Sequence, residues 1–126
     1  PPNKNHPIKH INQINVNDYD ILIIPGGVKA MEKIRQNKNL IKFISDFNNL
    51  NKVIACICSG VQLMISAKIV KGKKIAGYYS LEDDINNAGA IYTDLPAVVD
   101  NKIITTAHYK DMGPWMKEAL RILNEN

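Results

Sequence analysis

Two short apolar runs mark the first half of the chain, and each ends in a glycine-containing turn. Residues 21–24 read ILII before Pro-Gly-Gly, and residues 53–57 read VIACI before Cys-Ser-Gly. Neither run alternates with polar residues, which is typical of strands covered on both faces. We therefore predict two buried strands at these positions.

Apolar residues at helical spacing follow both runs. Between residues 40 and 50 they recur every third or fourth position, and Lys42, Asp46 and Asn48 lie on the opposite face. Residues 61–67 are mostly apolar and predict a buried helix directly after the second strand. Pro114 is expected to be the first residue of a final helix. The predicted buried face of that helix consists of Trp115, Met116, Ala119, Leu120 and Leu123.

Shorter elements are predicted between these helices and on either side of them. Asp100-Asn101 is expected to form a hairpin turn. Ser80 with Asp83 resembles a capping box, which would open a short helix that stops at Gly89. The polar lead-in, residues 1–18, could supply a short edge strand at best. The further predicted strands are 75–78, 90–93, 97–99 and 102–107.

Buried strands that alternate with helices predict an α/β fold with a mostly parallel sheet, helices on both faces and an antiparallel pair near the C-terminus. The length of 126 residues fits a single domain, residues 1–126. No apolar stretch is long enough for a membrane span. We expect no contact with a membrane.

Charge and cysteine content add little to this picture. The net charge is +4, but only Lys71, Lys73 and Lys74 cluster, around Gly72 in a predicted surface turn, so we expect no nucleic-acid partner. The two cysteines are one residue apart, which is awkward for a disulfide and favours a reducing, cytoplasmic location.

No metal site or cofactor is expected. His6 and His10 have the spacing of metal ligands on a helix, but Pro7 lies between them and no third ligand is evident.

Cys58 occupies the most informative position. A hydrophobic strand leads into it, Ser59 and Gly60 follow, and a helix begins at once, which is the layout of a nucleophile elbow. The start of the helix is expected to favour a thiolate. The backbone N–H of Ser59 would point at an oxyanion formed on attack. A small buried cysteine at a strand end explains the local pattern equally well.

A second glycine turn supports the interpretation of Cys58 as a reactive residue. Gly26 and Gly27 end the first strand, and their backbone N–H groups can face a ligand. Ligands of parallel sheets bind outside the carboxyl ends of the strands, which is where both turns lie. The two turns therefore predict one site.

Residues 19–124 resemble the ThiJ/PfpI family of the class I glutamine amidotransferase-like superfamily. The resemblance rests on IIPGG, on VIACICSGVQLMISAKIVKGKKIAGYYSLEDDINNAGA and on VVDNKIITTA. It implies a flavodoxin-like three-layer sandwich, a homodimer or higher homo-oligomer, a reactive cysteine at Cys58, and oxyanion donors on the backbone of Gly27 and Ser59.

The chain departs from the pattern of this family in three places. PfpI-type members carry His directly after the elbow cysteine, where this chain has Ser59. The first strand–helix unit of the family, which holds a buried acid, is missing before Tyr19, so we expect a separate N-terminal segment to supply Glu or Asp beside Cys58. Where PfpI-type members have Ser-Arg-Gly-Pro, residues 106–109 read Thr-Ala-His-Tyr.

The last departure makes His108 a candidate base for Cys58, with a surface histidine as the alternative. Tyr109 is a candidate pocket residue beside it. Tyr78 aligns with an active-site position of some family members, and Glu32 with an acid that PfpI-type oligomers give to a neighbouring subunit. Packing of an aromatic ring and an ordinary exposed carboxylate are the respective alternatives.

We therefore expect a cysteine-dependent hydrolase or lyase that acts on a peptide, acyl or reactive-aldehyde substrate. The alternative is a non-catalytic, chaperone-like stress-response protein in which Cys58 senses oxidation. A glutaminase-type amide transferase is disfavoured, because the chain has no downstream His-x-Glu pair.

Overall fold

The computed structural model describes residues 10–125. Its main sheet has the order β1-β2-β6-β5, in which β1 (Ile21–Ile24), β2 (Val53–Ile57) and β6 (Ile103–Thr106) are parallel. The edge strand β5 (Val98–Asp100) runs antiparallel to β6. The predicted α/β class, the mostly parallel sheet and the antiparallel pair near the C-terminus are confirmed.

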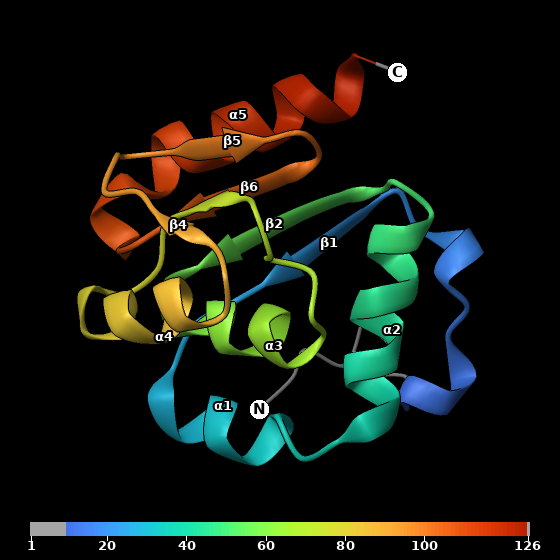
Figure 1. Cartoon of the computed structure of the whole chain (residues 1–126). Coiled ribbons are helices and arrows are strands. Elements are labelled where there is room, and N and C mark those ends of the chain that lie inside the picture. The colour runs from blue at the N-terminus through green and yellow to red at the C-terminus, as the bar shows by residue number, and fades with distance from the viewer. Residues whose placement is uncertain (1–9, 126) are drawn as a thin grey trace.

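Helices cover both faces of this sheet, so the fold has three layers. Figure 1 shows α1, α2, α3 and α4 on one side and α5 on the other. The five α-helices of the described residues are α1 (Val28–Ile34), α2 (Lys38–Asn49), α3 (Val61–Ser66), α4 (Glu82–Asn87) and α5 (Met112–Asn124).

Strand β2 lies at the centre of two hydrophobic clusters. Ile54 and Cys56 face the layer of α1–α4, while Val53, Ala55 and Ile57 face α5. All five residues are buried. Full burial explains why this strand reads as a continuous apolar run rather than an alternating one.

Strand β1 is less covered than its sequence predicts. Ile24 is 3% exposed, but Ile23 is 49% exposed. The prediction of burial on both faces is wrong for this strand, because β1 lies at the edge of the described sheet while α5 packs on β2 and β6.

Helix α5 also differs in detail from its prediction. It begins at Met112, so Pro114 is its third residue. Leu120 is 48% exposed, whereas the unpredicted Ile122 is buried with Trp115 and Ala119. The side chains of Met116 and Leu123 are partly buried. The indole N–H of Trp115 donates to the Ile104 carbonyl at 3.1 Å and fixes the helix on β6.

The middle of the chain forms shorter strands than expected. Strands β3 (Lys74–Ile75) and β4 (Ile91–Tyr92) pair with each other in a separate parallel sheet. The capping box at Ser80 is wrong: the N-cap of α4 is Leu81, without a side-chain hydrogen bond, and Ser80 lies in a 3-10 turn, η4 (Tyr79–Leu81). Gly89 ends this region as predicted, with φ of 87°.

The described part of the lead-in contains no strand. It forms two 3-10 turns, η1 (Ile11–Gln13) and η2 (Val16–Asp18), which pack on α2. Its hydrophobic side chains join the cluster on that side of the sheet, whereas a sheet edge would have needed an extended backbone. His10 caps η1, while His6 and the rest of residues 1–9 lie outside the described residues.

The hairpin between β5 and β6 turns where the sequence places it. Asp100 pairs with Ile103, and Asn101 adopts a positive φ of 56°. Asparagine tolerates the left-handed region better than most residues, which explains its place in the turn.

Candidate active site

Two turns meet at the carboxyl end of β1 and β2. These neighbouring strands are in parallel register, with Ile24 opposite Cys56. The turns approach so closely that a Cβ on Gly60 would stand 2.5 Å from the Pro25 carbonyl oxygen. Glycine at position 60 therefore allows the loop after β1 to lie directly against the start of α3.

Cys58 lies at this junction with a strained backbone. Its φ is 59°, a left-handed conformation that costs a non-glycine residue about 1–2 kcal/mol. It follows β2 and opens a 3-10 turn, η3 (Cys58–Gly60), that continues into α3. The sharp strand-to-helix turn expected from the sequence is present, and the cysteine in it is half-buried.

The side chain of Ser59 is within hydrogen-bonding distance of the Cys58 sulfur. Its hydroxyl oxygen lies 3.8 Å from the Cys58 sulfur, and the residue is 2% exposed. A buried hydroxyl can donate to a thiolate but does not serve as a base near neutral pH.

Gly26 leaves a space that Cys58 and Tyr109 share. A Cβ at position 26 would stand 2.9 Å from the Cys58 Cβ and 3.1 Å from the Tyr109 hydroxyl oxygen. The Tyr109 hydroxyl and the Cys58 Cβ therefore both lie close to Gly26. Residues from β1, β2 and the segment after β6 converge at this point.

Gly27 adopts a conformation that favours glycine. Its φ is 118° and its ψ is 106°, and its carbonyl accepts the Met31 N–H at 3.0 Å as α1 begins. This residue sets the direction in which the chain leaves the site.

Tyr78 also lies beside Cys58. Its backbone N–H donates to the Cys58 carbonyl at 3.2 Å, and its ring is 36% exposed and packs on Tyr79 at 5.6 Å. The segment after β3 therefore closes one side of the site through a main-chain contact.

His108 has a local structural role. Its Nδ1 accepts the Lys110 N–H at 3.0 Å and caps a 3-10 turn, η5 (Tyr109–Asp111). Its ring is exposed and meets the Tyr109 ring edge-on at 6.3 Å. Within residues 10–125, no hydrogen bond joins His108 to Cys58.

Glu32 and Cys56 differ in their exposure to solvent. Glu32 is exposed on α1. Cys56 is 1% exposed inside β2, and burial, followed by the nearby charge of Cys58, raises the pKa of its thiol well above the ordinary value. Cys56 is therefore a packed thiol, and both cysteines are free of disulfides.

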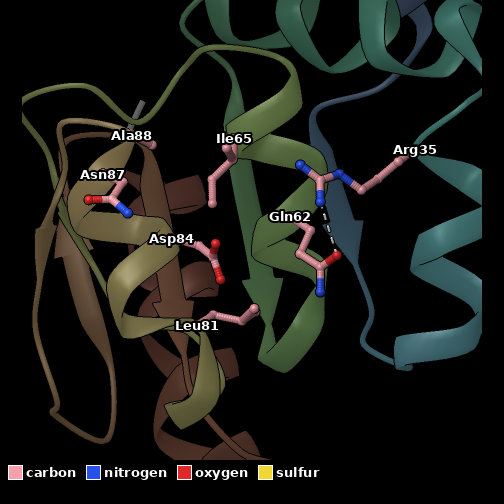
Figure 2. A pocket seen from close by; sticks show the side chains of 7 residues that line it. All are labelled: Arg35, Gln62, Ile65, Leu81, Asp84, Asn87 and Ala88. Carbon is pink, nitrogen blue, oxygen red and sulfur yellow. Dashed lines mark hydrogen bonds between the residues drawn. The ribbon is translucent and has the colours of Figure 1, made fainter.

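Sequence reasoning missed a cavity beside α3, apart from Cys58. Figure 2 shows the Arg35 guanidinium at its edge, where it donates to Gln62 Oε1 at 3.2 Å; it also donates to Ser66 Oγ at 2.9 Å. The cavity has a volume of about 340 Å³. No motif signals it, because Arg35 is 27 residues from Gln62 in the chain. The cavity is lined by Arg35, Gln62, Ile65, Leu81, Asp84, Asn87 and Ala88.

Residues 10–125 contain neither a metal-binding cluster nor a membrane-spanning helix. No group of three or more His, Cys, Asp or Glu side chains in these residues could hold a metal ion. No helix in this part of the chain has both the length and the apolar character needed to cross a bilayer.

A family model described as DJ-1/PfpI matches residues 4–122. The chain belongs to the DJ-1/PfpI family. The flavodoxin-like fold expected from the ThiJ/PfpI resemblance is therefore confirmed.

Among family relatives, the chain is similar to deglycase PfpI of Pyrococcus furiosus, with 34% identity over 111 residues, 88% of this chain and 66% of the relative. It is 34% identical to general stress protein 18 of Bacillus subtilis over 116 residues, 91% of this chain and 67% of the relative. The chain thus spans about two thirds of the length of the curated relatives it matches.

A crystal structure gives the same fold. A two-domain protein of Anabaena variabilis with DJ-1/ThiJ/PfpI-like and ferritin-like domains superposes with a TM-score of 0.85 and 30% identity. The match covers 90% of this chain and 32% of that protein.

Proposed function

We propose that this DJ-1/PfpI protein is a cysteine-dependent hydrolase or lyase that acts on a peptide, acyl or reactive-aldehyde substrate through Cys58. One observation carries the proposal: Cys58 has φ of 59° at the junction of β2 and α3, against the glycine loop that follows β1. A strained backbone of this kind is typical of residues held in place for chemistry. The junction also lies on the edge of the sheet where substrates of parallel α/β folds bind.

In this proposal the Cys58 thiolate attacks the carbonyl carbon of the substrate. The backbone N–H groups of Ser59 and Gly27 stabilise the negative charge that develops on the carbonyl oxygen. The left-handed conformations of Cys58 and Gly27 support this role, because each directs the chain away from a strand at the same rim.

The proton acceptor comes, in this proposal, from a segment outside residues 10–125. Within these residues no carboxylate or imidazole is hydrogen-bonded to Cys58. Strand β1 is an edge strand here, and Ile23 is 49% exposed. A further strand would pair with this open edge of β1 and pass close to its end, where an Asp or Glu would face Cys58.

We also propose that the protein is a homodimer or higher homo-oligomer. Glu32 is exposed on α1 and follows the Gly26–Gly27 loop, so it is available to a neighbouring subunit. Light scattering on the purified protein tests this: a monomer mass across the micromolar range would contradict it.

An oxidation sensor is the second candidate function. Ser59 stands where PfpI-type members carry His, and its hydroxyl lies 3.8 Å from the Cys58 sulfur. A hydroxyl can support a thiolate or a sulfinate by hydrogen bonding without providing a base for turnover.

Two measurements separate the candidates. Turnover of methylglyoxal and of a fluorogenic peptide is measured with the full-length protein and with Cys58→Ala; loss of turnover in the variant supports the enzyme. No Cys58-dependent turnover of either substrate would contradict it. Mass spectrometry after mild peroxide then tests the sensor, which requires oxidation of Cys58.

A further inference from the structure

The hydroxyl of Tyr109 occupies a position that neither the fold nor the helix cap explains. Its oxygen lies 3.1 Å from the point where a Cβ of Gly26 would stand, and the Cys58 Cβ lies 2.9 Å from the same point. Among residues 10–125, this hydroxyl has no hydrogen-bond partner, and Tyr109 is 48% exposed. A polar group of this kind is free to bind a ligand that reaches Cys58.

The ring that carries this hydroxyl is held from its other side. His108 caps η5 through the Lys110 N–H, and its ring meets the Tyr109 ring edge-on, with an interplanar angle of 70°. His108 therefore contacts Tyr109, while Tyr109 reaches the rim at Cys58. His108 thus supports the turn and the Tyr109 ring, while the Tyr109 hydroxyl lies at the site.

We propose that Tyr109 donates a hydrogen bond to the oxygen of the carbonyl that Cys58 attacks. The inference rests on the proposed function of Cys58 and deepens it. A phenol is a suitable donor, since it is neutral and needs no titration to offer its proton.

The step requires no other reactant. A sulfur electron pair forms the carbon–sulfur bond, and the π pair of the carbonyl moves to the oxygen. The Tyr109 O–H then donates to the oxyanion together with the N–H groups of Ser59 and Gly27, and no proton has to leave the phenol for the adduct to form. The product of the step is a tetrahedral alkoxide bonded to the Cys58 sulfur. With an aldehyde probe, uptake of one proton from water then gives the neutral hemithioacetal.

The test compares Tyr109→Phe with Tyr19→Phe in the full-length protein. Both remove only a hydroxyl from a partly exposed tyrosine, and Tyr19 lies at the opposite end of β1 from Cys58. Three quantities are measured: the formation constant of the Cys58 adduct with ¹³C-labelled methylglyoxal by NMR, kcat/KM for methylglyoxal, and the rate of Cys58 alkylation by iodoacetamide.

We expect Tyr109→Phe to weaken the adduct and to lower kcat/KM by roughly tenfold, the effect of one lost hydrogen bond to a charged oxygen. Alkylation of Cys58 stays within about twofold, because Tyr109 acts on the substrate oxygen and not on the sulfur. Tyr19→Phe leaves all three quantities unchanged.

Other results overturn the proposal in distinguishable ways. An unchanged adduct constant in Tyr109→Phe, with turnover that still depends on Cys58, contradicts the role of Tyr109 and leaves the proposed function intact. Equal losses in adduct formation and alkylation place Tyr109 on the thiol, against the proposal. Absence of both adduct and turnover in the native protein contradicts both inferences.

Discussion

Gly60 and Pro25 are in direct contact across two loops that are 35 residues apart in the chain. A Cβ on Gly60 would stand 2.5 Å from the Pro25 carbonyl oxygen and 2.9 Å from the Ile24 Cγ2. Backbone on one side and a buried strand on the other leave little room for relaxation. This contact joins the two turns into a single rim.

Gly60→Ala is therefore expected to destabilise the protein by about 1–3 kcal/mol, the range of an overpacked site. Gly113→Ala is the matched control, because a Cβ there meets nothing within 4 Å and alanine is the better helix former. Urea denaturation of both variants measures the difference. Equal stability of the two variants would contradict the contact.

Gly26→Ala is expected to impair activity more than stability. The new methyl group would meet the Cys58 Cβ at 2.9 Å and the Tyr109 hydroxyl at 3.1 Å, so both groups must shift. Displacement of reacting groups by about 1 Å can lower kcat/KM on the order of a hundredfold. Steady-state kinetics measure kcat/KM and urea denaturation measures stability, with Gly113→Ala as the control for both. Full activity in Gly26→Ala would show that neither group is used.

The two cysteines are expected to differ sharply in reactivity. Burial raises the pKa of the Cys56 thiol, so this thiol stays protonated and inaccessible at neutral pH, whereas Cys58 is half-buried. Brief treatment of the folded protein with iodoacetamide should label Cys58 and leave Cys56 unmodified, as read by peptide mass mapping. Comparable labelling of both residues before unfolding would contradict the burial of β2.

Adjacent isoleucines on β1 give a test of the edge position. Ile24→Ala removes a 3%-exposed side chain from the core and is expected to cost about 2–5 kcal/mol. Ile23→Ala truncates a side chain that is 49% exposed and should cost less than about 1 kcal/mol. Urea denaturation of both variants measures the difference, and equal costs would contradict the exposed position of Ile23.

The strand–turn–helix around Cys58 could be predicted because its signals are local. An apolar run, a small residue and a glycine lie within eight residues, and the structure forms β2, η3 and α3 there. The periodicity between residues 40 and 50 was sufficient for α2 for the same reason. Local patterns fix element type when the pattern and the packing agree.

Burial at edges could not be predicted, since it depends on which element lies opposite. Ile23 resembles Ile24 in sequence but faces a part of the sheet that α5 leaves open. Likewise, Leu120 fits an apolar helix face, yet the actual direction of α5 buries Ile122. The burial of these side chains depends on how the helices and strands pack in three dimensions, and the periodicity of the sequence carries no information on that packing.

The arrangement of His108 and Tyr109 illustrates the same limit in the site. Chemistry favours histidine as the partner of a cysteine. The turn after β6 instead uses the His108 ring as a cap and brings the Tyr109 hydroxyl to Gly26.

The most direct test of the central claim is the turnover of methylglyoxal and of a fluorogenic peptide by Cys58→Ala and Cys56→Ala, measured side by side in the full-length protein. The two residues are two positions apart in the chain and differ in burial, so the pair separates chemistry from packing. We predict that Cys58→Ala abolishes turnover, while folded Cys56→Ala retains it despite a lower stability. Retention of native turnover by Cys58→Ala would contradict the assignment of Cys58 as the nucleophile.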